Sequence, residues 1–544
     1  MRPLDAEIGT ASALVIDGTA SSRQVLTAML RECGVGDVQQ ATKPSDARRL
    51  LEHHTYDIVL CEFHFHGEAL TGQELFDDLR QAGAIPLSTV TVMISSESVY
   101  GKVVDAAEAA LDAYLIKPHT EDALRDKVLQ ARQRKRALKD VIDLVAAGRF
   151  DEAASLARAR FETRGPAWLH AARIGAELYL RLGRPTDAQT MLEAVLQTGA
   201  LPWARLGVAR AQVEAGTVQK ARRTLESLLG DCPGYADAYD IMGRVLLDQN
   251  EPHKALEAMR RSIELTPHSV TRLVKLGLLA FYYGDPAEAS DALDKAVRLG
   301  INSRVFDLQG LVLLAALQHD RADRRGLALS VASMKRMVAT APYSPRLKRF
   351  GAIVGILKAL VDRQLPDAAH MISTLLNEVR AADFDFEAAC NLLMVLSRMG
   401  TQDELHLPDL TRNVRRLAAR FAVSHTTTEM LRAALRGQAA LDSAVQEEAQ
   451  RVTGLAQQAV SHSLAGRPRD AVLALLEGAE QTINAKLMDL AAHTLDRHRA
   501  AIDDADSLAL RVMGLETQFR SYGAQVRMAR IDDARTMNAA ARPG

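Results

Sequence analysis

The sequence predicts an α/β domain with a parallel five-stranded sheet, followed by a long all-α solenoid. Two observations lead to this fold class. Short apolar runs alternate with amphipathic stretches over residues 11–133, and small residues recur with a period of 34 residues further along the chain. Aromatic residues make up 4% of the sequence, which favours closely packed helices over additional sheets.

Five apolar runs are expected to form the strands of the sheet. Between them lie stretches whose apolar residues are spaced by three and four positions, a pattern typical of helices. Such alternation predicts a doubly wound parallel sheet that is covered by helices on both faces. The runs occupy residues 13–17, 37–41, 57–61, 88–95 and 113–117.

Polar residues stand at the carboxyl ends of four of these runs. Asp17 ends the first, Glu62 follows the third, Ser95 ends the fourth and Lys117 ends the fifth. Because the carboxyl ends of parallel strands meet at one edge of a sheet, these side chains should converge on a single pocket. This order of two acids, a hydroxyl and a lysine resembles the receiver domain of bacterial response regulators, a flavodoxin-like fold.

The resemblance implies a site for phosphoryl transfer. In that family an aspartate after the third strand accepts phosphate, and two acids after the first strand help it to hold Mg²⁺. The hydroxyl and the lysine contact the phosphoryl oxygens, and Ser95 and Lys117 match them. The acids match only in part, because Asp17 is followed by Gly18 and the acceptor position is Glu62.

Both departures act against phosphorylation. Mg²⁺ needs near-octahedral oxygen ligands, and Gly18 supplies no carboxylate. The carboxylate of Glu62 reaches about 1.5 Å further than that of an aspartate, which displaces metal and phosphate from Ser95 and Lys117. Positioning supplies most of the catalysis in phosphoryl transfer. We therefore expect a relict pocket that neither autophosphorylates efficiently nor retains Mg²⁺, and we expect no other cofactor.

Two roles stay open for Glu62. Its carboxylate could pair with Lys117 and hold the domain permanently in an active-like state, as an imperfect mimic with one charge where a phosphate carries about two. It could equally be an inert remnant of the acceptor. A third reading, a genuine phosphorelay regulator, requires another acid such as Asp17 to accept the phosphate.

The loop after the third run carries two histidines and an acid that could suggest a metal site. His64, His66 and Glu68 have no fixed geometry in a loop, and no further cluster of ligands stands nearby in sequence. The four cysteines are scattered without a CxxC pair, which argues against zinc. We predict no metal site.

From about residue 138 the chain repeats itself. Gly216 and Asn250 are 34 residues apart, and so are Pro233 and Pro267. Small residues at fixed offsets with a closing proline resemble the tetratricopeptide repeat, which implies pairs of antiparallel helices. The small residues allow the two helices to approach closely, and the proline ends the second helix.

The repeat register predicts that Gly243 and Ala255 face one another within a helix pair. Residues 121–145 read as one continuous helix that joins the sheet domain to the repeats. Beyond residue 300 the period is lost but the helical spacing continues. The predicted domains are a receiver-like domain at 1–133, tetratricopeptide repeats at 134–300, a helical continuation with drifted repeats at 301–525, and a polar tail at 526–544.

Composition and motifs reduce the number of function classes that the sequence allows. A net charge of −1 gives no global field for nucleic acid or anionic lipid. No run approaches the roughly 20 apolar residues of a membrane span, and there is no secretory leader, so we expect a cytoplasmic protein. Phosphate-loop, zinc-protease and serine-hydrolase motifs are absent from the sequence, so we do not expect an enzyme.

The leading hypothesis is a signal-transduction adaptor of the response-regulator class. Its receiver would work without phosphorylation, and its helical repeats would bind a protein partner. The alternatives are the genuine phosphorelay regulator and, less favoured, a nucleic-acid-binding regulator that uses the basic segment at residues 132–139. The resemblance also allows a dimer through the receiver surface at about residues 97–130.

Overall fold

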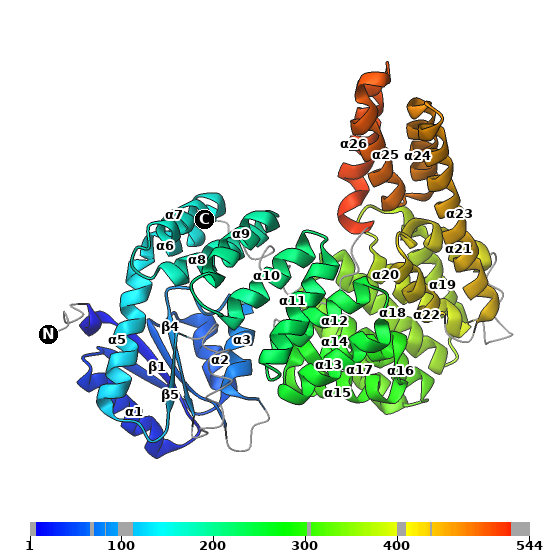
Figure 1. Cartoon of the computed structure of the whole chain (residues 1–544). Coiled ribbons are helices and arrows are strands. Elements are labelled where there is room, and N and C mark those ends of the chain that lie inside the picture. Colours follow the sequence, from blue (N-terminus) through cyan, green and yellow to red (C-terminus); the bar gives the residue numbers. More distant parts are fainter. Residues whose placement is uncertain are drawn as a thin grey trace. The chain divides into compact units, whose positions relative to one another are not determined.

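The computed structural model describes residues 7–65, 70–81, 83–95, 112–301, 306–399, 410–435 and 438–523 (Figure 1). The described chain divides into two compact units. The first contains the sheet and the helices up to residue 276, together with the end of the helix that finishes at residue 300. The second contains residues 277–294 and the described residues from 307 onward.

The first unit begins with a five-stranded parallel sheet in the order β2-β1-β3-β4-β5. Every predicted strand is confirmed, and each lies within two residues of its expected bounds. The inner strands are mostly apolar and are buried along almost their whole length, because helices cover both of their faces. The strands are β1 (Ser12–Ile16), β2 (Asp37–Ala41), β3 (Ile58–Glu62), β4 (Val90–Ser95) and β5 (Ala113–Ile116).

Helices pack on both faces of this sheet, as the alternating pattern predicts (Figure 1). On one face, α1 (Ala20–Glu32) and α5 (Glu121–Ala137) bury leucines against the strands. On the other, α2 (Pro44–His53) and α3 (Gly72–Gln81) bury Phe76, which is fully enclosed. The receiver-like α/β fold is therefore confirmed.

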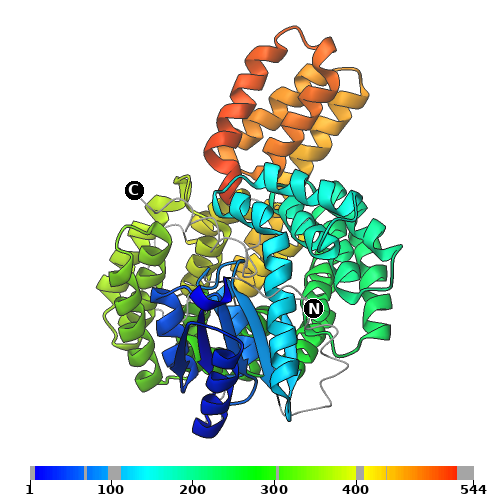
Figure 2. The ribbon, with the colours of Figure 1, turned by 90° about the vertical axis from the view of Figure 1, so that its left-hand side faces the viewer.

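The link between sheet and repeats differs from the prediction of one continuous helix. The helical run breaks at Leu138, where φ is −107° and ψ is 10°, and α6 (Lys139–Ala146) starts anew. Leu138 is 3% exposed and belongs to the core of the first repeats. Burial of this side chain outweighs the helix propensity of the residues around it. Figure 2 shows α5, in cyan, leading from the sheet into these helices.

The helices after α6 form the predicted antiparallel pairs. A Cβ added to Gly243 would lie 3.7 Å from the carbonyl oxygen of Ala255, so the predicted repeat register is confirmed. The turn residues Gly216 and Asn250 have φ of 72° and 60°, the left-handed conformation that ends a helix. The helices are α7 (Phe150–Glu162), α8 (Trp168–Arg181), α9 (Pro185–Leu196), α10 (Pro202–Glu214), α11 (Val218–Asp231), α12 (Ala236–Asp248), α13 (Pro252–Leu265), α14 (Val270–Tyr283) and α15 (Pro286–Gly300).

The second unit continues as helices, as the spacing beyond residue 300 predicts. Among the described residues no helix is long and apolar enough to cross a membrane. The tail at 526–544 lies outside the described residues, and the predicted domain boundaries stay predictions. The helices are α16 (Gln309–Asp320), α17 (Arg324–Thr340), α18 (Pro345–Val361), α19 (Leu365–Asn377), α20 (Phe386–Met399), α21 (Leu410–Phe421), α22 (His425–Ala434), α23 (Ala439–Leu464), α24 (Pro468–Thr482), α25 (Ala485–His498) and α26 (Ala505–Gly523).

Close approach of two helices makes Gly277 a test of the repeat packing. A Cβ at Gly277 would come within 2.6 Å of Cδ2 of Leu293, which is fully buried. We expect Gly277→Ala to cost about 1–2 kcal/mol through overpacking, seen as faster hydrogen exchange in α15. Gly514→Ala is the control, because nothing lies within 4 Å of its added Cβ. An equal effect of both variants would contradict this packing.

Candidate functional site

Asp17 lies just after β1 and is 1% exposed. Its Oδ1 accepts a hydrogen bond from the backbone N–H of Thr19 at 2.7 Å, and its Oδ2 accepts one from the hydroxyl of Ser22 at 2.6 Å. Burial works to raise the pKa of Asp17, but the two hydrogen bonds and the nearby charge of Lys117 outweigh it. The pKa therefore lies below its usual value, and Asp17 is a carboxylate.

Glu62 ends β3 and is 7% exposed. Its Oε1 accepts a hydrogen bond from the backbone N–H of Phe63 at 3.0 Å, and its Oε2 forms an ion pair with Nζ of Lys117. The same ammonium lies 3.2 Å from Oδ2 of Asp17 and 3.1 Å from the hydroxyl of Ser22. One cation therefore bridges two carboxylates and a hydroxyl.

The surroundings of Lys117 favour its charged form. Burial works to lower the pKa of Lys117, but the hydrogen bonds and charges of Glu62 and Asp17 raise it above its usual value. The two acids thus hold the ammonium in place, and the ammonium in turn offsets the cost of burying their side chains.

Ser95 joins the site through its backbone. It is fully buried at the end of β4, and its carbonyl oxygen accepts a hydrogen bond from the N–H of Lys117 at 2.7 Å. The four predicted residues thus lie at one edge of the sheet. The side chains of Asp17, Glu62 and Lys117 are in direct contact, and Ser95 fixes the strand end that carries Lys117.

Three further residues support Asp17, and sequence reasoning missed them. Thr19 and Ser22 supply the hydrogen bonds to its carboxylate, and Nη1 of Arg23 donates to its carbonyl oxygen at 2.7 Å. The available signal was a threonine and a serine two and five positions after the strand-ending acid, where the start of a helix presents hydroxyl and N–H donors to an anion.

The start of α3 is fixed against the backbone of Glu62. The N–H of Gly72 donates to the carbonyl oxygen of Phe63 at 2.8 Å. A Cβ at Gly72 would lie 2.9 Å from Sγ of Cys61 and would collide with the carbonyl oxygen of Glu62. Only glycine fits this approach, so the first turn of α3 packs directly against the end of β3.

This arrangement suits a closed ion-pair site better than a metal site. A cation would have to displace the ammonium of Lys117 from Asp17. Within the described residues, no group of three His, Cys, Asp or Glu side chains could hold a metal ion. His64 stacks edge-on against Phe63 with 4.6 Å between ring centroids, while His66 and Glu68 lie outside the described residues.

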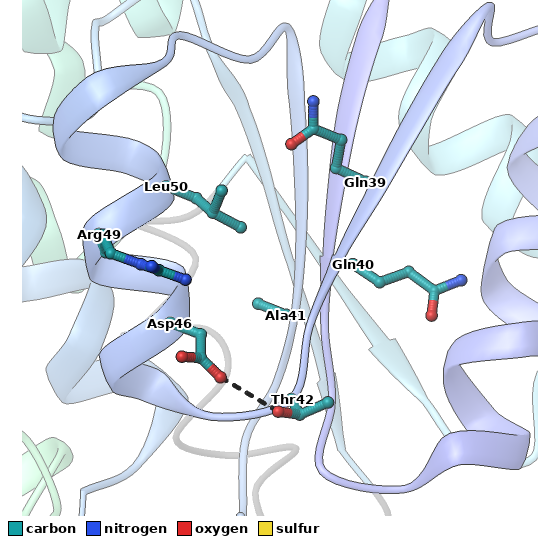
Figure 3. Close-up of a pocket in the computed structure, with 7 residues that line it drawn as sticks. All are labelled: Gln39, Gln40, Ala41, Thr42, Asp46, Arg49 and Leu50. Atoms are coloured by element: carbon teal, nitrogen blue, oxygen red, sulfur yellow. Dashed lines mark hydrogen bonds between the residues drawn. The ribbon is translucent and has the colours of Figure 1, made fainter.

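A separate open hollow of about 520 Å³ lies at the outer edge of the sheet, beside β2 and α2 (Figure 3). Within it, the hydroxyl of Thr42 donates to Oδ2 of Asp46 at 3.1 Å. None of the four predicted site residues lines the hollow, so it is distinct from the ion-pair site. Its lining residues are Gln39, Gln40, Ala41, Thr42, Asp46, Arg49 and Leu50.

Comparison with known proteins supports the receiver-like fold of the sheet domain. Residues 13–129 match the family model of the response regulator receiver domain. Chemotaxis protein CheY-3 of Vibrio cholerae is 25% identical over 115 residues, which are 21% of this chain and 86% of that protein. Chemotaxis protein CheY of Pseudomonas aeruginosa is 24% identical over 115 residues, 21% of this chain and 90% of that protein.

Two solved structures that are similar to this chain are helical repeat proteins. TTC0263, a thermophilic tetratricopeptide repeat protein of Thermus thermophilus, is 23% identical to this chain with a TM-score of 0.26. The match covers 34% of this chain and 95% of the TTC0263 chain. A human IFIT1 dimer with m7Gppp-AAAA is 11% identical to this chain with a TM-score of 0.32. The match covers 87% of this chain and 99% of the IFIT1 chain.

Proposed function

We infer, from a chain that contains a response regulator receiver domain at residues 13–129 followed by tetratricopeptide-like helical repeats, that this protein is a signalling adaptor. In this proposal the receiver works without phosphorylation, and the repeats bind a protein partner in the cytoplasm. The protein is not an enzyme and uses no metal or other cofactor.

The single observation that carries the proposal is the ion pair between Glu62 and Lys117. Both oxygens of Glu62 are engaged, one by Lys117 and the other by the N–H of Phe63. A carboxylate that accepts a phosphoryl group must present a free oxygen in line with the leaving group, with a metal to neutralise the phosphate. Here the lysine that would contact the phosphate is bound by the acceptor itself and by Asp17.

A small phosphodonor tests this proposal directly. We expect the full-length protein, incubated with acetyl phosphate and Mg²⁺, to gain no stable phosphate by intact-mass spectrometry, because Glu62 is misplaced and occupied. A receiver that accepts phosphate under the same conditions is the positive control. Added phosphate that is lost in Glu62→Gln or Asp17→Asn would establish the phosphorelay alternative instead.

Affinity capture of partner proteins can distinguish between the two possible roles of Glu62. If Glu62 acts as a mimic of the phosphorylated state, Glu62→Gln keeps the fold and changes the set or amount of captured protein. Glu52→Gln makes the same chemical change at an exposed position of α2 and is the matched control. Equal capture by wild type and both variants would identify Glu62 as an inert remnant.

The basic segment at residues 132–139 does not favour a nucleic-acid partner. Arg132 is 9% exposed, Nζ of Lys135 lies 3.1 Å from Oδ1 of Asp112, and Arg134 donates to the carbonyl oxygen of Asp112. These cations are engaged within the protein, so we keep protein as the proposed partner class. The surface proposed for a dimer, about residues 97–130, lies partly outside the described residues.

A further inference from the structure

The first turn of α3 contacts the repeats through one carboxylate. Oε1 of Glu74 accepts a hydrogen bond from the backbone N–H of His268 at 3.1 Å. His268 lies in the connection between α13 and α14, and both residues belong to the first compact unit. This hydrogen bond therefore joins the receiver to the repeats across 194 positions of the sequence.

The other oxygen of Glu74 caps its own helix. Oε2 accepts hydrogen bonds from the N–H and the hydroxyl of Thr71, each at 2.9 Å, while the N–H of Glu74 donates to that hydroxyl at 3.2 Å. This reciprocal arrangement is a capping box. Glu74 is 6% exposed, and a buried carboxylate needs hydrogen-bond donors on its oxygens. The repeat supplies one of those donors.

The same turn is connected to the ion-pair site. Gly72 is bound to the carbonyl oxygen of Phe63 and packs on that of Glu62, while the N–H of Phe63 donates to Oε1 of Glu62. The path from Glu62 through Gly72 and Glu74 to His268 thus consists of direct contacts through backbone and a capped helix turn. Such a contiguous path can carry a displacement from one end to the other.

We propose that Glu74 couples the ion-pair site to the repeats at the connection between α13 and α14. While Lys117 holds Glu62, the first turn of α3 stays in place and Glu74 holds the connection before α14. Release of Glu62 lets the first turn of α3 shift, which breaks the hydrogen bond to His268 and frees that part of the repeats. This inference rests on the proposed adaptor function, because it gives the receiver a direct means to alter the partner-binding repeats.

Hydrogen exchange on the full-length protein tests the coupling. Glu62→Gln weakens the ion pair while keeping the shape of the side chain. We expect it to speed exchange of the amides at residues 269–273 about tenfold, the effect of losing a hydrogen bond to a charged group. His268→Pro removes the N–H and leaves Glu74 and its cap intact. In this variant the same amides should exchange faster than in wild type. Adding Glu62→Gln to His268→Pro should not increase their exchange rate further.

Gly234→Pro is the matched control, because Gly234 stands 34 residues before His268, at the same position of the preceding repeat. It must leave the response to Glu62→Gln intact. If His268→Pro disturbs folding, Glu74→Gln replaces it, since its amide oxygen still accepts from Thr71 while its NH2 group cannot accept from the N–H of His268. The proposal is overturned if Glu62→Gln speeds exchange in β3 and leaves residues 269–273 unchanged. Phosphodonor and capture experiments test the adaptor function separately.

Discussion

Replacing Lys117 with methionine is expected to destabilise the receiver by about 2–4 kcal/mol at neutral pH, because it removes one member of a largely buried ion pair. The carboxylates of Asp17 and Glu62, 1% and 7% exposed, would then face each other without the cation between them. The expected value is below that of a fully buried pair, since the side chain of Lys117 is 27% exposed. Hydrogen exchange in β1 and β3 of the full-length protein measures the loss locally.

The contribution of this site to the free energy of unfolding should depend on pH, and the pKa shifts give the direction. The folded pKa of Asp17 lies below its ordinary 3.8, so its contribution is present above that value and disappears as pH falls through the folded pKa. The folded pKa of Lys117 lies above its ordinary 10.5, so its contribution is present below that value and disappears as pH rises through the folded pKa. Wild type is therefore stabilised by this site between these limits.

Lys117→Met should lose this plateau and regain stability as pH falls, since protonation of one carboxylate relieves the repulsion. Adding Glu62→Leu should restore most of the loss, because it removes the second anion. Lys43→Met, at an exposed position before α2, is the control and should have little effect. A deficit that is independent of pH would show that the lysine contributes through its hydrophobic stem instead.

The second large effect is expected for Gly72→Ala, at about 3 kcal/mol or more. Its added Cβ would lie 2.9 Å from Sγ of Cys61 and still closer to the carbonyl oxygen of Glu62. Unlike the flexible end of a side chain, this carbonyl belongs to a central strand and cannot move without breaking the sheet. Exchange of the amides in β3 and the first turn of α3 should accelerate together.

Gly9→Ala is the matched control, since it adds the same methyl group to the same domain with nothing within 4 Å. Its expected effect is within about 0.5 kcal/mol. If the variant at Gly72 behaved like this control, α3 would not be packed on Glu62, and the coupling proposed for Glu74 would lose its first step.

Much of the fold could be predicted from the sequence, because burial leaves a simple pattern there. Residues 58–61 are all apolar because the strand is covered on both faces, and the spacing of Gly216 and Asn250 reflects one repeated turn. The break at Leu138 could not be predicted, because helix-favouring residues surround it and only packing against the repeats turns the chain.

Some residues of the candidate site could likewise be predicted from the sequence, and others could not. Asp17, Glu62 and Lys117 come together because parallel strands end at one edge, so their order along the chain was sufficient. Ser22 sits in a helix turn whose orientation depends on packing, and its role became visible in the structure. The pattern of Thr71 and Glu74 is a capping signal, but nothing in either stretch of sequence points to the N–H of a loop 194 positions away.

The hydrogen bond from His268 to Glu74 has a consequence for the order in which a newly made chain assembles. The receiver core needs α5, which packs against α1, so it can close once about 140 residues have left the ribosome. The contact at Glu74 must wait for residue 268, on the order of ten seconds later at ordinary rates of synthesis. Every nascent chain therefore passes through an interval with a finished receiver whose Glu74 still lacks its donor from the repeats.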